Sequence, residues 1–554
     1  MSEVILSKIY EHERASYSKE TWLTQPLGGG PVKTYSYEES VARARSMATY
    51  LKAQGFEPGS KIAIISKNCA HFFITELAIW MAGHTTVALY PTLDSDTVSY
   101  ILEHSDAKFC FVGKLDVWDK MKDGVPADMP KVAFPLAPPN TGLTSFDDAI
   151  ADVEPMGGEP TRDPEDIALI IYTSGSTGQP KGVMHNFGRI TFCAREVIKE
   201  FDFTRRERML SYLPLAHVFE RAFVEMTSFY KGSQIFFAES IDTFVEDLKR
   251  ARPTVFISVP RLWLKFQQGV FQKMPPSRLN LLLNVPVVNN IIRKKILGGL
   301  GLEHVRLAAS GSAPIPGDLI AWYRKLGLNL LEGYAMSEDF AYSHRSTVEI
   351  NEVGYVGTPF KGVEVRIADD GEIQIKSPGA MIGYYKEDEK TAAAFTDDGF
   401  FKTGDRGERK PNGLLKITGR VKEIFKTAKG KYVAPAPIEN KINNDPNIEL
   451  SCVSGVGRPQ PYAQVVLSEE LRGKINQPGV KSKVDADLRA LRTSLNASLS
   501  KVDKLAFFVV VSEPWDIENG MLTPTMKIKR GSIEEHTAAS VDGWYDDGEP
   551  VVWA

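Results

Sequence analysis

The sequence has few cysteines and no pair of them at metal-binding or redox spacing. Its four cysteines, Cys69, Cys110, Cys193 and Cys452, are widely scattered, and its nine histidines do not cluster at ligand spacing. These absences argue against a disulfide framework and against a zinc site, and they fit a reducing compartment. The chain also lacks a signal-peptide pattern at its start and any run of about 18 uninterrupted apolar residues. The sequence therefore predicts a cytoplasmic protein.

The chain also has little net charge. A formal charge of −4 over 554 residues argues against a nucleic-acid-binding protein that depends on bulk electrostatics. With 43% hydrophobic and 25% charged residues, the composition is that of a folded globular protein rather than a disordered one. The length predicts more than one domain.

Short apolar runs alternate with helical patterns in the first fifth of the chain. Apolar residues at helical spacing predict a helix from Glu38 to Leu51, which the glycines and proline at 55–59 end. The same reasoning predicts three strands and one buried helix, at 61–65, 85–90, 108–112 and 71–83. Alternation of this kind predicts a parallel α/β layer. Residues 125–165 are rich in Pro, Asp and Gly and predict a surface connection.

A glycine- and hydroxyl-rich stretch follows the next buried strand. The apolar run 166–171 predicts that strand, and residues 172–182 read Tyr-Thr-Ser-Gly-Ser-Thr-Gly-Gln-Pro-Lys-Gly. Glycines let the backbone turn its N–H groups toward an anion, hydroxyls add donors, and a lysine adds positive charge. The stretch therefore predicts a site for nucleotide phosphates. Its candidate binding residues are Thr173, Ser174, Gly175, Ser176, Thr177, Gly178 and Lys181.

Two other loop motifs are excluded for this stretch. The Gly-x4-Gly-Lys-Ser/Thr spacing of a Walker loop is absent, and so is the Gly-x-Ser-x-Gly of a nucleophile elbow. A mobile Ser/Gly linker is the alternative, but such a linker rarely follows a buried strand directly. The eleven residues closely resemble the signature loop of the adenylate-forming superfamily, which comprises acyl-CoA synthetases, luciferases and peptide-synthetase adenylation domains.

The resemblance extends from about Thr34 to Arg530 and implies a fold of class α/β. It implies a large N-terminal domain of several subdomains with layered α/β sheets, residues 1–421, which binds nucleotide and acyl group. It also implies a small mobile α+β domain, residues 422–554, which carries the catalytic lysine.

Further segments match motifs of this superfamily. Residues 213–221, Leu-Pro-Leu-Ala-His-Val-Phe-Glu-Arg, are similar to the loop whose histidine, here His217, lies beside the acyl group. A histidine after an apolar run is otherwise more often a satisfied core residue. The forms of this segment and of residues 258–263 resemble the fatty acyl-CoA synthetase branch. Residues 311–313 and 332–337 resemble the turns that bind adenine and the α-phosphate. The nucleotide-binding residues implied there are Gly311, Ser312, Ala313, Glu332, Gly333, Tyr334, Ala335, Met336 and Ser337.

Metal and ribose contacts are implied in the same way. Glu338 is implied as a catalytic residue and, with Thr173, as a ligand of Mg²⁺, which prefers hard oxygen donors. Asp405 and Arg420 resemble the family's two ribose contacts. A turn-capping carboxylate is the alternative for Asp405.

The C-terminal motifs concern the moving parts of such an enzyme. Lys422 falls where the family has its domain hinge, and residues 429–431 resemble the loop that lines the pantetheine tunnel. The CoA-binding residues implied are Lys429, Gly430 and Lys431. Lys527 follows Leu-Thr-Pro-Thr and resembles the family's catalytic lysine. A surface lysine is otherwise a solvated charge with no role.

The resemblance implies a two-step reaction. A carboxylate and ATP give acyl-AMP and pyrophosphate, and the CoA thiol then displaces AMP. The implied cofactor is Mg²⁺, with ATP and CoA as co-substrates and a small-molecule carboxylic acid, a fatty acid, as partner; no nucleic acid is implied. Alternatives left open are transfer to a carrier-protein pantetheine, a ligase for aryl or for short- or medium-chain acids, a luciferase-like oxygenase, and a regulatory nucleotide-binding protein without catalysis. The oligomeric state is open, with a homodimer among the alternatives.

Residues 276–295 mix apolar and basic side chains. One interpretation is a helix packed on the core and broken at Pro286. The other is a segment that lies on a membrane surface and gives the protein a peripheral membrane contact.

Overall fold

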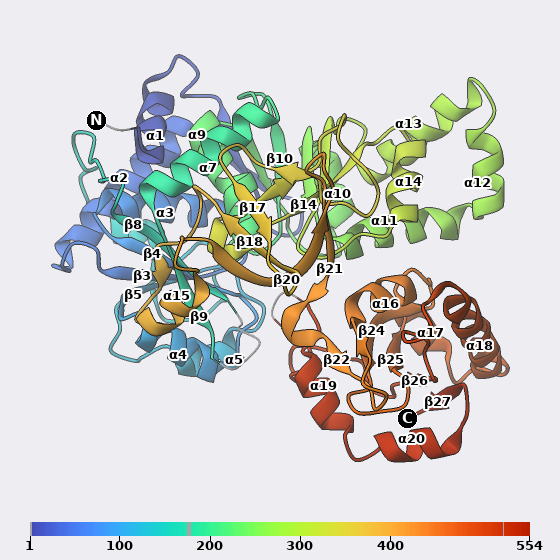
Figure 1. Cartoon of the computed structure of the whole chain (residues 1–554). Coiled ribbons are helices and arrows are strands. Elements are labelled where there is room, and N and C mark those ends of the chain that lie inside the picture. Colours follow the sequence, from blue (N-terminus) through green and yellow to red (C-terminus); the bar gives the residue numbers. More distant parts are fainter. Residues whose placement is uncertain (1–2, 174–178, 524–525) are drawn as a thin grey trace.

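The computed structural model of the chain describes residues 3–173, 179–523 and 526–554 (Figure 1). Within this part of the chain, the largest sheet has eight strands in the order β19-β9-β8-β4-β3-β5-β6-β7. They are β3 (Lys61–Ile65), β4 (Thr85–Leu89), β5 (Ala107–Val112), β6 (Lys131–Ala133), β7 (Thr144–Ser145), β8 (Ile167–Thr173), β9 (Lys181–Asn186) and β19 (Gly383–Tyr384). Neighbouring strands from β8 to β7 run parallel, whereas β9 pairs antiparallel with both of its neighbours. The predicted parallel α/β layer is confirmed.

The helices of this region begin and end close to where the sequence predicts. α2 (Tyr37–Ala53) starts after Ser36, whose hydroxyl oxygen accepts a hydrogen bond from the backbone N–H of Glu39. α3 (Ala70–Met81) is buried along its whole length, because its sequence is apolar on every side. α4 (Ser95–His104) follows β4. These helices and the sheet share one large apolar core.

A second sheet carries the predicted adenine- and phosphate-binding turns. Its strands, in the order β12-β13-β14-β15-β16, are β12 (Val255–Ser258), β13 (Leu307–Ser310), β14 (Leu330–Tyr334), β15 (His344–Arg345) and β16 (Thr358–Pro359). The first three run parallel, with α11 (Pro260–Lys273) after β12 and α14 (Gly317–Lys325) after β13. Ligands of α/β sheets bind beyond the carboxyl ends of parallel strands, and the Gly311 turn and residues 335–338 follow such ends.

Two smaller sheets complete the first part of the chain. One has the order β10-β11-β1-β2, with β1 (Thr21–Pro26), β2 (Val32–Ser36), β10 (Arg208–Ser211) and β11 (Gln234–Phe237). The other has the order β17-β18-β20-β21, with β17 (Glu364–Ile367), β18 (Glu372–Lys376), β20 (Phe401–Arg409) and β21 (Leu415–Arg420). Further helices here are α1 (Ile5–Arg14), α7 (Phe187–Glu200), α9 (Met226–Lys231), α10 (Phe244–Ala251) and α15 (Asp388–Ala394). The register of β20 and β21 sets Asp405 opposite Arg420.

From β22 on, the chain builds its own apolar clusters. The strands here are β22 (Phe425–Lys426), β23 (Tyr432–Val433), β24 (Ile448–Ser454), β25 (Tyr462–Leu467), β26 (Phe508–Val510) and β27 (Val551–Trp553). The helices are α16 (Pro435–Ile442), α17 (Glu469–Lys474), α18 (Val480–Ser498), α19 (Arg530–Thr537) and α20 (Val541–Asp547). Among the described residues, every member of the apolar clusters in this part is Phe425 or a later residue. Every member of the clusters in the first part of the chain is Ile417 or an earlier residue. In Figure 1 this orange-to-red part forms its own body below the remainder.

Residues 125–165 are more than the predicted surface connection. They contain β6, β7 and α6 (Phe146–Ile150), and the two strands extend the largest sheet at one edge. Phe146 is fully buried. The prediction was wrong because strands of two or three residues are too short to show a hydrophobic period.

Residues 276–300 form a helical pair with a break at Pro286, where the sequence predicts one. The helices are α12 (Pro276–Leu283) and α13 (Val288–Leu300), and Figure 1 shows both at the outer edge of the molecule. Leu279 and Leu283 of α12 are buried, whereas α13 buries no residue. No helix in the described ranges is long and apolar enough to cross a bilayer.

Candidate active site

The signature stretch is held between two paired strands. β8 and β9 run antiparallel, and their register sets Thr173 opposite Lys181. Glycine is required at position 182, because a Cβ there would lie 2.8 Å from Cγ2 of Ile170. The strands therefore fix both ends of the stretch. Its predicted residues Ser174, Gly175, Ser176, Thr177 and Gly178 lie outside the described residues.

Lys181 and Glu338 meet through one aromatic side chain. The ammonium nitrogen of Lys181 lies 4.9 Å from the ring centroid of Tyr384, a cation–π distance. The Tyr384 hydroxyl donates to Oε1 of Glu338 at 2.9 Å. The backbone N–H of Met381 donates to the Glu338 carbonyl at 2.6 Å. The signature lysine and the predicted metal-binding carboxylate thus lie together, and Tyr384 is a site residue that sequence reasoning missed.

Tyr334, Asp405 and Arg420 form one hydrogen-bonded group. The Tyr334 hydroxyl donates to Oδ2 of Asp405 at 2.8 Å, and Nε of Arg420 donates to Oδ1 at 3.0 Å. Burial raises the pKa of Tyr334, and the charge of Asp405 raises it further, so the phenol keeps its proton. Burial opposes the charge of Arg420, but Asp405 and Glu423 outweigh it and raise the pKa of this guanidinium. A carboxylate has about four acceptor sites, so Asp405 can still accept further hydroxyls.

The segment after β14 is fixed by buried side chains. The backbone N–H of Met336 donates to Oδ1 of Asp339 at 3.0 Å. Nε2 of His185, on β9, donates to the Ser337 carbonyl at 2.8 Å. Burial lowers the pKa of His185 to about 3, so the ring stays neutral and keeps this donor. The predicted residues from Gly333 to Glu338 are therefore tied to the strand that begins at Lys181.

Lys527 belongs to a small hairpin near the end of the chain. Leu522 and Ile528 form an antiparallel bridge. The backbone N–H of Lys527 donates to Oγ1 of Thr523 at 3.1 Å, and the N–H of Thr523 donates to the Lys527 carbonyl at 2.8 Å. Pro524 and Thr525 lie outside the described part of the chain. These hydrogen bonds fix the backbone position of Lys527.

The electrostatic surroundings of Lys527 come from the first part of the chain. Surrounding protein disfavours the charged ammonium and lowers the pKa of Lys527, and the positive charge of Arg420 lowers it further. Asp405 and Glu338 act in the opposite direction. The charge of Lys527 in turn acts on His217. Part of the lysine side chain remains exposed, so the group is accessible while it lies among these residues.

His217 lies at the end of its loop and caps α8 (Val218–Glu220). Its Nδ1 accepts a hydrogen bond from the backbone N–H of Phe219 at 3.1 Å. Burial, reinforced by the charge of Lys527, lowers the pKa of His217 to about 3. The neutral ring therefore carries its proton on Nε2, which is free to donate to a neighbouring oxygen.

A buried ionic pair supports this loop from behind. Arg221 is 1% exposed; its Nε donates to the Leu215 carbonyl at 2.8 Å, and its guanidinium pairs with Glu76 at 2.6 Å. Arg221 begins η2 (Arg221–Glu225), a π-helical turn. Such turns occur frequently at functional sites. The pair fixes the carbonyl two residues before His217.

Asn68 holds the same loop from the other side. Its Nδ2 donates to the Leu213 carbonyl at 2.7 Å, and its Oδ1 accepts from the backbone N–H of Leu215 at 3.2 Å. Glu220 accepts from Asn68 at 3.2 Å, and burial raises the pKa of Glu220 to about 8. Sequence reasoning missed Asn68, Glu76 and Arg221 as site residues. Glu220 and Arg221 belong to the motif 213–221, but the sequence indicated only that this motif resembles the fatty acyl-CoA synthetase branch and gave neither residue a role.

The Gly311 turn lies against an aromatic ring. A Cβ on Gly311 would be 3.2 Å from Cζ of Phe219, and Ser312 has a φ of 68°, in the left-handed region. The predicted adenine turn and the histidine loop therefore meet at Phe219. Glu332 lies nearby on β14; its Oε2 has no hydrogen-bond partner within the described residues, and burial raises its pKa to about 7.

The predicted hinge and CoA-binding residues lie apart from this group. Lys422 lies in η4 (Val421–Glu423) and is exposed. Residues 429–431 form the turn between β22 and β23, are exposed, and include Gly430 at a φ of 72°. No hydrogen bond or ion pair between described residues links this turn to Lys181, Glu338 or Asp405.

The donor set fits a metal ion that is held mainly by a substrate. No group of three or more His, Cys, Asp or Glu at metal-binding distance occurs in the described part of the chain. Magnesium at nucleotide sites keeps several waters and takes one or two protein ligands beside phosphate oxygens. Glu338 is half-buried, and Tyr384 is hydrogen-bonded to its Oε1, so that Oε2 fits such a ligand.

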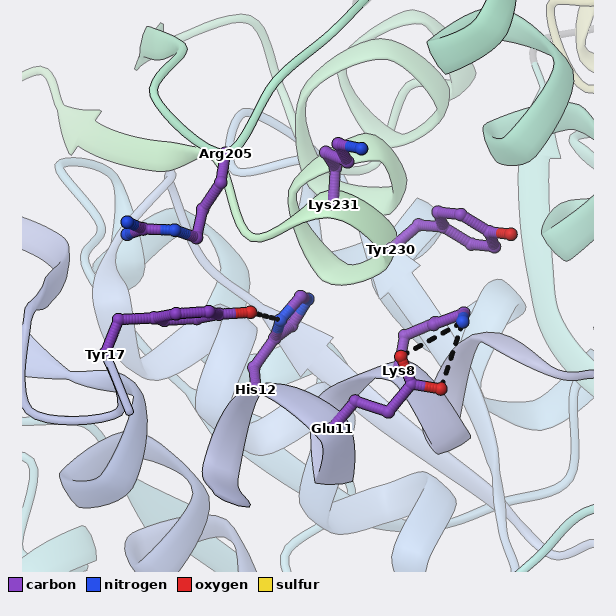
Figure 2. A pocket seen from close by; sticks show the side chains of 7 residues that line it. All are labelled: Lys8, Glu11, His12, Tyr17, Arg205, Tyr230 and Lys231. Atoms are coloured by element: carbon purple, nitrogen blue, oxygen red, sulfur yellow. Dashed lines mark hydrogen bonds and ion pairs between the residues drawn. The ribbon is translucent and has the colours of Figure 1, made fainter. Parts of the chain in front are cut away.

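A separate pocket of about 360 Å³ lies beside α1 and the end of α9 (Figure 2). It is lined by Lys8, Glu11, His12, Tyr17, Arg205, Tyr230 and Lys231. In this pocket Lys8 pairs with Glu11 at 3.0 Å, and the Arg205 guanidinium lies 4.1 Å from the Tyr17 ring centroid. None of the predicted site residues lines it, so it is distinct from the candidate active site.

The layered sheets, the separate C-terminal part and the convergence of these residues define an adenylate-forming fold. The model of the AMP-binding enzyme family matches residues 11–385, and that of the AMP-binding enzyme C-terminal domain matches residues 422–549. The chain belongs to the AMP-binding enzyme family. This confirms the resemblance to the adenylate-forming superfamily that the motifs indicate.

Relatives match over nearly the whole chain. A long-chain-fatty-acid–CoA ligase of Mycobacterium bovis is 29% identical over 98% of this chain and 97% of its own length. Long-chain-fatty-acid–CoA ligase 5 of Rattus norvegicus is 29% identical over 94% of this chain and 85% of its own. Among solved structures, the adenylation domain of a carboxylate reductase from Mycobacterium chelonae has a TM-score of 0.82 at 23% identity, covering 98% and 91% of the two chains. At that identity the likeness shows the fold.

Proposed function

We propose that the protein is an ATP-dependent fatty acyl-CoA ligase. The carboxylate of the acid attacks the α-phosphate of ATP, forming acyl-AMP and releasing pyrophosphate. The thiolate of CoA then attacks the acyl carbonyl, forming the thioester and releasing AMP. The family membership and the names of the relatives support this reaction. The observation that supports it most is that Lys527 lies within the electrostatic reach of Glu338, Asp405 and His217.

In the first step, the protein supplies charge and alignment rather than covalent chemistry. Lys181 and the hydroxyl and N–H groups of residues 173–178 hold the β- and γ-phosphates. Lys527 bridges the carboxylate and the α-phosphate as a point charge. Glu338, with the Thr173 hydroxyl, would hold Mg²⁺, which neutralises phosphate charge when bound. Tyr384 supports this arrangement because it contacts both Lys181 and Glu338.

The nucleoside and the acyl group take the neighbouring positions. Asp405 accepts the ribose hydroxyls while Arg420 holds its carboxylate in place. The adenine lies between Tyr334 and the turn Gly311, Ser312 and Ala313, beside the segment from Glu332 to Ser337. His217 donates from Nε2 to the acyl carboxylate, and a ring with a pKa near 3 stays neutral and keeps this donor.

The second step requires another arrangement of the same chain. We infer two domains, residues 1–421 and 422–554, with Lys422 as the hinge. The second family model begins at residue 422, and the apolar clusters on the two sides share no residue among those described. Rotation about Lys422 removes Lys527 and brings in Lys429, Gly430 and Lys431 to line the path of CoA.

The relatives favour a long-chain acid as the substrate and free CoA as the acceptor. The cytoplasm remains the expected compartment, although two relatives from Arabidopsis thaliana are named as peroxisomal. Transfer to a carrier-protein pantetheine and ligation of aryl or shorter acids are the competing functions.

Two assays decide among these functions. ATP–pyrophosphate exchange with straight-chain acids of two to eighteen carbons and with aryl acids identifies the acid. Thioester formation with free CoA against a carrier-protein pantetheine identifies the acceptor. We expect exchange to be fastest with a long-chain acid and transfer to free CoA. Exchange with aryl acids alone, or transfer to the carrier protein alone, would contradict the proposal.

A further inference from the structure

The basic residues of the chain are unevenly distributed along the sequence. Between Asp247 and Glu303 there is no aspartate or glutamate, and these 55 residues contain ten lysines and arginines. The whole chain, in contrast, has a formal charge of −4. Residues 248–302 therefore carry a local excess of positive charge in an otherwise slightly acidic protein.

Most of these cations have no acidic partner. Lys249, Arg250 and Arg261 form ion pairs with Glu246, Asp247 and Glu449. Nε of Arg252 donates to Nε2 of His304 at 3.0 Å. The remaining six have no ion pair with any described residue, and all but Arg293 are exposed. They are Lys265, Lys273, Arg278, Arg293, Lys294 and Lys295. Unpaired surface cations attract anions over about a Debye length.

Large apolar side chains are exposed among these cations. Leu281 is 68% exposed, Val285 40%, Val287 74% and Ile291 61%. They lie on α12, on α13 and on the turn between them, at the outer edge of the molecule in Figure 1. We call residues 276–295 the α12–α13 tip. Clustered exposed apolar residues with a polar rim mark an interaction site.

The way the tip is attached keeps this surface outward. Leu279 and Leu283 anchor α12 in the second apolar cluster, with the rings of the neighbouring α11. α13 buries none of its residues. The anchored side of α12 therefore faces the protein, while Leu281 and the Val285–Val287 turn remain in solvent.

We propose that the α12–α13 tip docks the protein on an anionic membrane surface. Exposed leucine, valine and isoleucine enter the boundary between headgroups and acyl chains, and the surrounding lysines and arginines pair with lipid phosphates. The six cations that have no ion pair among the described residues match an anionic leaflet in charge, and the apolar tip matches its hydrocarbon boundary. A nucleic acid would use the cations but leave the aliphatic side chains exposed.

The docking surface does not depend on the ligase reaction. It does have a consequence that rests on the proposed function: a docked ligase would take a fatty acid from the bilayer in which such acids dissolve. Membrane binding is therefore measured without ATP, acid or CoA, so that its failure and a failure of the proposed function are separate results.

The direct test is co-sedimentation of the full-length protein with vesicles. One set of vesicles is phosphatidylcholine alone, and the other contains about one third phosphatidylglycerol. We expect binding to the anionic vesicles, weakening with added salt, and little binding to the neutral ones. The variant Arg278→Glu/Lys294→Glu/Lys295→Glu should bind on the order of 100-fold more weakly, because each cation near an anionic surface contributes about a fivefold factor.

The apolar half of the surface has its own variant. Leu281→Ser/Val287→Ser/Ile291→Ser keeps every charge, and it should lose binding that survives high salt. Its thermal stability should be unchanged, because all three side chains are already exposed. Retained salt-resistant binding would overturn the insertion of these residues.

A matched control carries the same charge change elsewhere. Lys481→Glu/Lys483→Glu/Lys501→Glu alters three exposed lysines of the C-terminal part and should bind like the unaltered protein. Equal losses in this control and in the tip variant would overturn the assignment of the site. So would binding that ignores lipid charge, no binding at all, or a dimer in solution that only the tip variants dissociate.

Discussion

Two lysine-bearing hairpins of the C-terminal part lie in opposite environments. The hairpin 521–529 brings Lys527 among charges of the first part of the chain, where Arg420, Asp405 and Glu338 all act on its pKa. The turn 429–431 is exposed, and no hydrogen bond or ion pair between described residues links it to that group. In the proposed two-step reaction, the two hairpins would serve the same site in turn. The difference supports the proposal that this structure has the arrangement of the adenylation step and that CoA transfer needs a rotation.

The largest expected effect comes from removing the Lys527 side chain, which tests whether its hairpin serves only the first step. Lys527→Ala should lower ATP–pyrophosphate exchange about 1,000-fold, because loss of one preorganised charge at a phosphoryl centre costs that much. Thioester formation from supplied acyl-AMP should stay within about threefold. Lys529→Ala, an exposed lysine two residues further along, is the control and should change neither rate. Equal losses in both half-reactions would refute the role of Lys527.

The second prediction concerns the rotation itself. Lys422→Pro fixes φ and removes a backbone N–H at the expected hinge. Because the observed arrangement already suits adenylation, exchange should be nearly unchanged, while CoA transfer should fall about 100-fold. Stopped-flow measurement of the two steps checks this. An unaltered overall rate would contradict the role of Lys422 as the hinge.

The third prediction addresses the exposed turn. Lys429→Ala/Lys431→Ala should raise KM for CoA about tenfold through loss of two cations along the path of an anionic substrate, and exchange should not change. Lys426→Ala, on the adjoining strand β22, is the control and should leave the KM for CoA unchanged. An effect on exchange, with CoA kinetics intact, would reverse the assignment of the two hairpins.

The smallest effect is expected from the residue that joins Lys181 to Glu338. Tyr384→Phe keeps the ring under the ammonium but removes the hydrogen bond to the carboxylate, so exchange should fall about fivefold. Tyr385→Phe loses a hydroxyl bonded to Asp106 instead and should leave exchange unchanged. Identical behaviour of the two variants would mean that Tyr384 only packs.

Sequence patterns were sufficient to predict those elements whose signal lies in residues adjacent in the sequence. The apolar helix at α3 and the strand before Thr173 could be predicted because their signals are local. The segment from Glu332 to Glu338 was recognised only through its resemblance to the superfamily motif, and its role stays a prediction. Asp405 and Arg420 were found only through the resemblance to the superfamily; the structure adds that adjacent strands set them opposite each other.

The supporting residues could not be predicted because their partners are distant in sequence. Asn68 bonds to a carbonyl 145 residues away, and Arg221 pairs with Glu76 at the same separation. Tyr384 meets Glu338 across 46 residues without any spacing that would reveal it. Such contacts depend on tertiary packing, which composition and period do not encode.

The central claim is that a lysine near the carboxyl end acts on a nucleotide held by the first part of the chain. A crystal structure with a non-hydrolysable acyl-adenylate analogue tests it most directly. We expect Nζ of Lys527 within hydrogen-bonding distance of the analogue's phosphoryl or carbonyl oxygen, and the ribose hydroxyls on Asp405. An analogue bound away from Tyr334 and Asp405 would contradict it.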